Sequence, residues 1–296
     1  TLQRKHQALH STVQDSNYYN DKVVECRQNK YLTNGMRLRK LPKSDLVISE
    51  IGIGTGTFGG DTSQTEADRI LDVSLKECGV NFIDTAELYP IPYRKSDFGL
   101  SEQIIGDYLS EHSKSFRESL VISTSICGYS NYIDWARGSE RELTRITKKQ
   151  VFEAVDAQLK RLNVEYIDLL QFQWPERYVP YQNTADYNHV FERREEEVTP
   201  VKVQLEIVQE LIKQGKVRSF GLSNESPYGV GLFSTTAKLL SLPEPVSLQT
   251  PVSLIERHDA GRHFAEACAK TNANLGLIAH SPLAGGVLTG KYNTQT

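Results

Sequence analysis

The chain is poor in sulfur-containing residues, and their placement excludes two kinds of site. Its 296 residues include one Met and four Cys, at Cys26, Cys78, Cys127 and Cys268. No two of the cysteines form a CxxC pair, and no Cys/His cluster has the spacing of zinc ligands. We therefore expect reduced thiols, no disulfide framework and no metal site.

Long apolar runs and a strong net charge are also absent. No stretch reaches the ~18 apolar residues of a membrane-spanning helix. The formal net charge is −3, which gives no electrostatic reason to expect nucleic acid or an anionic membrane as a partner. We expect a soluble intracellular protein. The start, TLQRKHQALHST, is basic and hydroxyl-rich, as in the remnant of a transit peptide, which would indicate an organelle matrix or stroma; a start shortened for another reason is the alternative.

No low-complexity linker divides the chain, and short apolar runs alternate with amphipathic stretches. Each run is bounded by turn residues, as expected of strands that are buried on both faces of a sheet. The predicted strands span residues 50–56, 80–86, 119–125, 166–172, 217–223, 245–251 and 275–281. Helices are predicted over 65–79, 147–163 and 201–216, weaker ones over 101–110, 228–240 and 261–271, and a hairpin over 36–49.

This alternation predicts a parallel sheet, either an open doubly wound sheet or a barrel. A doubly wound dinucleotide fold carries a glycine fingerprint that directly opens the first helix. The glycine-rich stretch 52–60 opens no helix, because the next helix is predicted only from about Thr65. The pattern therefore favours an α/β fold of the (β/α)8 TIM type, whose active site would lie at the carboxyl ends of the strands.

Five motifs at or near these strand ends occur in order along the chain. They are GIGTGTFGG (52–60), NFIDTAELY (81–89), YIDLLQFQWP (166–175), GLSN (221–224) and HSPLAGGVLTGKY (280–292). Together they resemble the aldo-keto reductase superfamily over about residues 36–292. The resemblance implies a (β/α)8 barrel that uses NADP(H). It divides the chain into an extension, 1–34, and a barrel, 35–296, with an insert at 176–200 where the family has a substrate-covering loop.

The same resemblance implies four catalytic positions. In the family, a tyrosine gives a proton to the substrate carbonyl while NADPH delivers a hydride, a lysine paired with an aspartate makes the tyrosine more acidic, and a histidine orients the carbonyl. Asp84 and Tyr89 match this pattern. Ser125 occupies the lysine position and Gln173 the histidine position, so the tetrad is half replaced.

The two replacements have unequal consequences. A free tyrosine has a pKa near ~10, and a neighbouring lysine lowers it by favouring the phenolate. Ser125 carries no charge, and an ionised Asp84 without its partner opposes the phenolate, so Tyr89 is expected to be a poor acid. Losing a positioned proton donor costs ~10²–10⁴ in rate. Gln173 is less damaging, since its amide still offers an N–H. Other cations on nearby loops are Arg94, Lys95 and Arg177.

The resemblance also places a cofactor at two of the motifs. Ser223 and Asn224 of GLSN would hold the nicotinamide carboxamide together with Gln249, and His280 replaces a tyrosine that stacks on the nicotinamide. The candidate NADP-binding residues are Thr55, Ser223, Asn224, Gln249, His280, Ser281, Leu283, Gly285 and Lys291. The alternative is that Ser223, Asn224 and Gln249 serve only packing and hydrogen bonding at the barrel mouth.

The two ends of the sequence raise the question of a partner. Seven strands are predicted, and the family's last βα unit, which grips the adenosine 2′-phosphate, does not follow; either the sequence stops early or something else covers the strand edges. Residues 1–34 are polar, with too few apolar residues to fold alone. We therefore expect residues 1–30 to contact a protein partner in a larger assembly, the alternative being a tail packed on its own barrel.

Three functions remain open on the sequence alone. The first is a catalytically impaired aldo-keto reductase-like protein kept as a structural or regulatory subunit. The second is an active NADPH-dependent oxidoreductase acting on a carbonyl or C=C substrate. The third is a binding module that senses the nicotinamide cofactor. Replacement of both lysine and histidine favours the first, and retention of Asp84, Tyr89 and GLSN supports the others.

Overall fold

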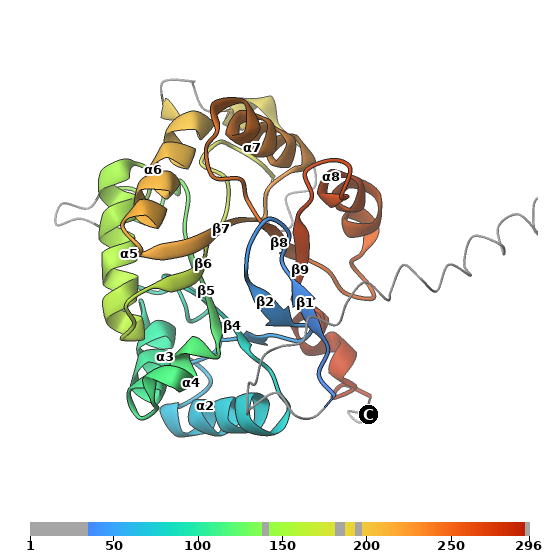
Figure 1. The fold of residues 1–296 in the computed structure, drawn as a ribbon. Helices are drawn as coiled ribbons and strands as arrows, with labels where there is room; N and C mark the ends of the chain where they lie inside the picture. The colour runs from blue at the N-terminus through green and yellow to red at the C-terminus, as the bar shows by residue number, and fades with distance from the viewer. Residues whose placement is uncertain (1–34, 138–141, 181–186, 193–196, 294–296) are drawn as a thin grey trace, which may run out of the picture.

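A computed structural model describes residues 35–137, 142–180, 187–192 and 197–293. These residues form a parallel sheet surrounded by helices, with a small hairpin across one end (Figure 1). The predicted extension 1–34, with the partner-binding residues 1–30, lies outside the described residues.

The strands follow one another in space in the order of the sequence. The hairpin strands are β1 (Leu38–Lys40) and β2 (Val47–Ser49), which pair antiparallel as predicted for residues 36–49. The parallel sheet consists of β3 (Ile53–Gly54), β4 (Phe82–Ala86), β5 (Val121–Ile126), β6 (Ile167–Phe172), β7 (Val217–Ser223), β8 (Ser247–Pro251) and β9 (Gly276–His280).

Helices occupy most of the connections between these strands. They are α2 (Gln64–Leu71) continued by the π-helix η2 (Asp72–Glu77), α3 (Leu100–Ser110), α4 (Lys114–Glu118), α5 (Lys148–Leu162), α6 (Val201–Lys213), α7 (Pro227–Leu240), and the short pair η5 (Ala260–Phe264) and α8 (Ala265–Cys268). Two 3₁₀ turns are η3 (His189–Phe191) and η6 (Ala284–Thr289). None of the described helices combines the length and the apolar composition that a membrane crossing requires.

The parallel order confirms the TIM-type barrel. In the part of the chain that the structure describes, the sheet has seven strands, and β3 and β9 are its end strands. Gly54, Gly56 and Gly59 do have the GxGxxG spacing of a dinucleotide fingerprint, but α2 begins only at Gln64. The fingerprint therefore does not open a helix here, and the doubly wound alternative is wrong.

Successive side chains of each strand point alternately outward and inward. The outward face is apolar, whereas the polarity of the inward face changes along the barrel axis. Ile83 of β4 and Ile122 of β5 face outward and pack in a cluster that includes residues of α2 and α3. The inward neighbours Phe82 and Val121 are apolar, whereas the next inward residues include Asp84 and polar side chains such as Ser123, Ser125 and Gln171. The barrel interior is thus apolar at its amino end and polar at its carboxyl end.

The β1–β2 hairpin closes the amino end of the barrel. Leu41, Leu46 and Ile48 are buried against Phe82, Val121, Leu169 and Val246, which lie at or near the starts of four strands. Lys43 donates to the carbonyl of Ala273 at 2.8 Å and pairs with Glu244 at 3.2 Å. The hairpin therefore binds elements from both halves of the chain.

Helices α3 and α5 approach each other through a glycine. A Cβ placed at Gly106 of α3 would lie 2.1 Å from the carbonyl oxygen of Arg161 on α5, far inside any normal contact. The same two helices share an ion pair between Arg161 and the buried Glu102, at 2.7 Å. The close approach fixes α3, which follows the loop that carries Tyr89.

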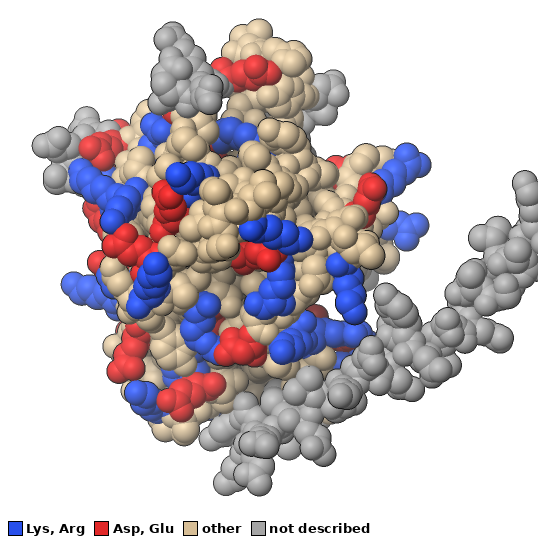
Figure 2. Space-filling model, turned by 45° about the horizontal axis from the view of Figure 1, so that its top comes forward, with Lys and Arg blue, Asp and Glu red and all other residues tan. Residues whose placement is uncertain are grey.

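Charges of both signs are interspersed over the surface. On the face drawn in Figure 2, lysine and arginine side chains alternate with aspartate and glutamate. Several oppositely charged side chains of the described surface pair, including Arg218 with Asp45 at 2.6 Å. This mixture agrees with the small net charge of −3 and shows no single-sign patch on that face.

Candidate active site

Three polar side chains from three neighbouring strands meet in one layer of the barrel interior. Gln171 of β6 donates through Nε2 to Asp84 Oδ1 of β4 at 3.1 Å and to Ser123 Oγ of β5 at 2.8 Å. The parallel register places Asp84 beside Ser123, and their side chains share a face because the strand period is two. The layer therefore satisfies the carboxylate with uncharged donors.

Asp84 has no charged partner in this layer. Burial raises the pKa of its carboxyl from 3.8 to about 6, and hydrogen bonds from Ser123 and Gln249 only partly oppose that shift. No lysine or arginine of the described ranges forms an ion pair with Asp84. The position where the family has a lysine holds the buried Ser125, opposite Ala86 on the adjacent strand.

Tyr89 lies in the loop just beyond β4. Its backbone N–H donates to the carbonyl of Ala86 at 3.1 Å, and the chain at Ile91 returns to Gly56, with N and O 2.8 Å apart. A Cβ placed at Gly56 would lie 3.7 Å from Cε2 and Cζ of Tyr89. The half-buried tyrosine ring therefore stands against the loop after β3, at the same end of the barrel as Asp84 and Ser125.

Gln173 is fixed at the carboxyl end of β6 and is oriented by a residue that the sequence analysis missed. Its backbone N–H donates to Ile126 at 2.8 Å, and its side-chain Nε2 donates to the hydroxyl of Tyr93 at 3.0 Å. Its Oε1 is buried and has no hydrogen-bond partner among the described residues. Tyr93 belongs to no motif, and only the fold brings it to Gln173, 80 positions away.

The three cations considered from the sequence do not supply the missing charge. Arg177 donates to both carboxylate oxygens of Glu225, at 2.9 and 2.5 Å. Arg94 lies 3.9 Å from Asp97, and Lys95 is exposed. Arg177 and Arg94 therefore have other carboxylate partners, and Lys95 faces solvent.

A buried arginine that the sequence analysis missed lies close to the site. Arg137, on the connection between β5 and α5, donates through Nε to Glu87 at 3.2 Å and through Nη2 to the carbonyl of Cys127 at 2.9 Å. Glu87 also accepts the backbone N–H of Cys127 at 2.6 Å. Because Glu87 balances the guanidinium, Arg137 ties two active-site loops together without giving a net charge to Asp84.

The predicted carboxamide-binding residues do converge. Asn224 donates through Nδ2 to the Ser223 hydroxyl at 3.1 Å and to the backbone carbonyl of Gln173 at 2.7 Å. Ser223 in turn donates to Gln249 Oε1 at 3.4 Å. Two amides and a hydroxyl offer both donors and acceptors, which is the complement that a carboxamide needs. This donor set fits the nicotinamide of NADP(H).

His280, at the end of β9, joins the same group. Its Nε2 lies 3.2 Å from Asn224 Oδ1 and its Nδ1 lies 3.1 Å from the Ser281 hydroxyl. Burial lowers the pKa of the imidazole, so the ring is neutral at pH 7. The ring thus donates to Asn224 and accepts from Ser281.

The other predicted cofactor residues are dispersed. Thr55 is fully buried, and its hydroxyl bonds with Ser101 at 2.7 Å and with the Asp84 carbonyl at 3.1 Å. Leu283 and Gly285 lie in an exposed loop in which Gly285 and Gly286 both have positive φ. Lys291 is exposed, with Nζ 5.0 Å from the centre of the Tyr292 ring. Their roles toward a cofactor stay predictions.

The described part of the predicted insert borders a hollow beside the site. The volume of this hollow is about 480 Å³, which is the size of a site for a small ligand. Tyr178, Tyr187 and Tyr228 line it together with Arg177 and Glu192. The Tyr178 and Tyr187 ring centres are 5.2 Å apart. A role of this loop in covering a substrate stays a prediction.

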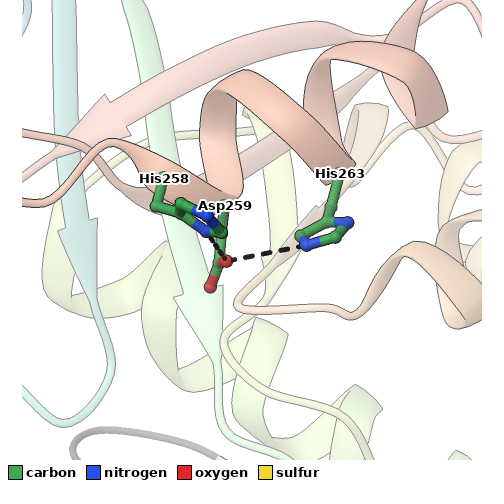
Figure 3. A group of neighbouring side chains, drawn as sticks. All are labelled: His258, Asp259 and His263. Atoms are coloured by element: carbon green, nitrogen blue, oxygen red, sulfur yellow. Dashed lines mark hydrogen bonds and ion pairs between the residues drawn. The ribbon is translucent and has the colours of Figure 1, made fainter.

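Among the described residues, one group of potential metal ligands lies on η5 and on the turn just before it. His258 Nδ1 is 3.3 Å and His263 Nε2 is 4.0 Å from Asp259 Oδ1 (Figure 3). All three side chains are exposed, and Arg257 and Arg262 lie in the same segment, where their charge opposes a bound cation. We assign no metal to this group, and the expectation of a metal-free protein stays a prediction.

The parallel barrel and the polar residues gathered at its carboxyl end define an α/β-barrel protein with a candidate site at the mouth of the barrel. Residues 50–296 match the family model described as "Aldo/keto reductase family", and the chain belongs to this family. The resemblance inferred from the five motifs is thereby confirmed.

Three known proteins illustrate the relationship. An "Aldo-keto reductase" of Babesia bovis is 40% identical over 177 residues, which are 58% of this chain and 61% of that protein. A "Probable voltage-gated potassium channel subunit beta" of Arabidopsis thaliana is 30% identical over 259 residues, 87% of this chain and 67% of its own length. The solved glycerol dehydrogenase of Gluconobacter oxydans has a TM-score of 0.64 at 26% identity, covering 88% of this chain and 67% of that one. The match to the Babesia protein thus spans less than two thirds of that relative.

Proposed function

We propose that this chain is a catalytically impaired member of the aldo/keto reductase family that acts as a structural or regulatory subunit and retains a nicotinamide-nucleotide site. One observation carries the proposal: Asp84 is held by uncharged partners, and its pKa is raised to about 6. In a site that activates a tyrosine through a lysine, the lysine would instead lower the pKa of this carboxyl.

The consequence falls on proton transfer. A bound NADPH would supply the hydride, and the protein must supply the proton that the carbonyl oxygen receives. Ser125 supplies no cation at the position where the family has a lysine, and a phenol with the ordinary pKa near ~10 gives up its proton reluctantly at pH 7. One N–H of the Gln173 amide is engaged by the Tyr93 hydroxyl at 3.0 Å, and the other N–H remains to orient a carbonyl. The replacement of the lysine is therefore the more damaging of the two.

The test is steady-state consumption of NADPH with a generic aromatic aldehyde. We expect weak or undetectable turnover for the wild type. We expect Ser125→Lys to recover more activity than Gln173→His, and the double variant to recover more than the sum, because the two groups act as one unit. Adding Tyr89→Phe to the double variant is the matched control, and it should remove the recovered activity. Wild-type turnover of ~1–10 s⁻¹, ordinary for enzymes, would refute impairment.

An active oxidoreductase is the second candidate. It is favoured by the retained Asp84 and Tyr89 and by relatives whose names describe a reductase and a glycerol dehydrogenase. Under this alternative, the wild type turns over a carbonyl, alcohol or C=C substrate, and Tyr89→Phe abolishes that activity. The same assay, run in both directions, separates the two candidates.

The subunit role is supported by the Arabidopsis relative named as a channel subunit and by the polar residues 1–30. We propose that these residues contact a protein partner. The protein should migrate in a defined complex in native extract, and deletion of residues 1–30 should release it while the barrel stays folded. If the shortened chain remains in the complex, or the intact chain migrates alone, the partner proposal fails.

A further inference from the structure

The amide of Asn224 is occupied at both ends by other parts of the protein. Its Nδ2 donates to the Gln173 carbonyl at 2.7 Å and to the Ser223 hydroxyl at 3.1 Å. Its Oδ1 lies 3.2 Å from Nε2 of His280. One of the two lone pairs of the oxygen that a carboxamide N–H would use is therefore already taken by the imidazole.

The second nitrogen of His280 holds the ring in this position. Nδ1 is 3.1 Å from the Ser281 hydroxyl. A neutral imidazole has one N–H and one acceptor nitrogen, so a ring that donates from Nε2 to Asn224 accepts at Nδ1 from Ser281. The lowered pKa of His280 keeps the ring in this neutral form at pH 7.

The bonds of His280 belong to a longer chain of hydrogen bonds across the barrel mouth. Gln249 bonds to the Asp84 carboxyl, Ser223 bonds to Gln249 at 3.4 Å, and Asn224 links Ser223 to His280. Within this chain, the N–H of the imidazole offers Asn224 the same interaction that the N–H of a carboxamide would offer. The ring fills one of the two lone-pair positions of Asn224 Oδ1, and a carboxamide that takes the same position must displace the ring.

We propose that His280 is an intramolecular latch that fills the carboxamide position on Asn224 and turns away when the nicotinamide binds. This inference rests on the proposed cofactor site. The latch makes His280 a residue that lowers cofactor affinity, in contrast to a ring that raises affinity by stacking. The sign of its effect on binding therefore separates the two roles.

The experiment is a titration of the full chain with NADPH, followed by fluorescence of the nucleotide, which requires no turnover. His280→Leu removes the N–H and cannot stack. We expect its dissociation constant to fall about five-fold, as releasing one neutral hydrogen bond allows. His280→Phe, which also lacks the N–H but can stack, should bind NADPH at least as tightly as His280→Leu does. His258→Leu is the matched control on an exposed histidine and should change nothing.

Each other outcome is decisive. Weaker binding by His280→Leu, with thermal unfolding unchanged, would overturn the latch and leave the cofactor site standing, because the ring would then support the nicotinamide. If His280→Leu does not fold, unchanged or weaker binding by His280→Phe, which also lacks the N–H, would overturn the latch. Absence of binding by every variant and the wild type would overturn the proposed cofactor site and the latch with it.

Discussion

At the scale of single residues, Asp84 shows how replacing a lysine by Ser125 changes the pKa of a carboxyl that is itself retained. The carboxyl is retained, but Ser125 stands at the position of the lysine and the hydrogen-bond partners of Asp84 are neutral. Its pKa is therefore governed by burial, and the proton is bound more tightly in the folded chain than in the unfolded one. The residue has changed from the partner of a cation into a group that titrates near neutral pH.

This change predicts a pH dependence of stability. Asp84 contributes stability that is full below its unfolded pKa of 3.8 and is lost as the pH rises through about 6. Relative to Asp84→Asn, which cannot titrate, the wild type should lose free energy of unfolding between about pH 4 and 7 and then stay level. Urea unfolding of both proteins across this range measures the difference. A difference that stays constant with pH would show that Asp84 keeps an ordinary pKa.

At the scale of elements, the contact between α3 and α5 depends on the missing side chain of Gly106. A Cβ there would meet the backbone of Arg161 and Leu162, at 2.1 and 2.9 Å, and backbone cannot move aside as a flexible side chain can. The two helices must separate to admit even a methyl group. That separation also strains the ion pair between Glu102 and Arg161.

We therefore expect Gly106→Ala to lower the free energy of unfolding by about 1–3 kcal/mol or more, the usual cost of overpacking. Gly231 on α7 is the matched control, since a Cβ there meets nothing within 4 Å. Gly231→Ala should stabilise by about 0.5–1 kcal/mol, because alanine loses less backbone entropy in a helix. Chemical unfolding measures both. Equal effects of the two substitutions would contradict the close helix contact.

Helices and strands were predictable from the sequence where one buried face gives the apolar residues a regular spacing. Helix 147–163 differs from α5 by one residue at each end, and strand 166–172 differs from β6 by one. Strand 50–56 was wrong in length, because β3 pairs on one side only and is reduced to Ile53–Gly54. Helix 261–271 was also too long, since α8 ends at Cys268.

The sequence predicted which residues lie at the site, but it did not predict which of them form hydrogen bonds with one another. A motif places Asp84, Ser125 and Gln173 at strand ends, because parallel strands bring their carboxyl ends together. It cannot show that Gln171 reaches Asp84 across 87 positions or that His280 reaches Asn224 across 56. These contacts depend on side-chain directions that only the folded backbone defines.

At the scale of the whole molecule, the β1–β2 hairpin joins the two halves of the sheet. Leu46 is 1% exposed and packs with residues at the starts of β4 and β5. A Cβ placed at Gly276, on β9, would lie 2.6 Å from Cδ2 of Leu41. The hairpin is therefore part of the core and acts as the floor of the barrel.

Leu46→Ala should lower the free energy of unfolding by about 2–5 kcal/mol, the range for a buried leucine whose removal leaves a cavity. Ile51→Ala, at a residue that is 61% exposed, should change it by less than about 0.5 kcal/mol. Both changes in the free energy of unfolding are measured from the midpoint of urea unfolding, with the dependence on urea concentration (the m value) unchanged. A small effect of Leu46→Ala would mean that the hairpin is dispensable for the barrel.

The hairpin also sets an order of events during synthesis. Residues 38–49 leave the ribosome early, yet Lys43 binds Ala273, 230 positions later, and Asp45 binds Arg218, 173 positions later. At about 5–20 residues per second, the nascent hairpin waits roughly 10–45 seconds for these partners. During that interval Leu41, Leu46 and Ile48 have no β9 to pack against. The hairpin is thus made before the partners that it packs on, and its apolar side stays uncovered until β9 has followed.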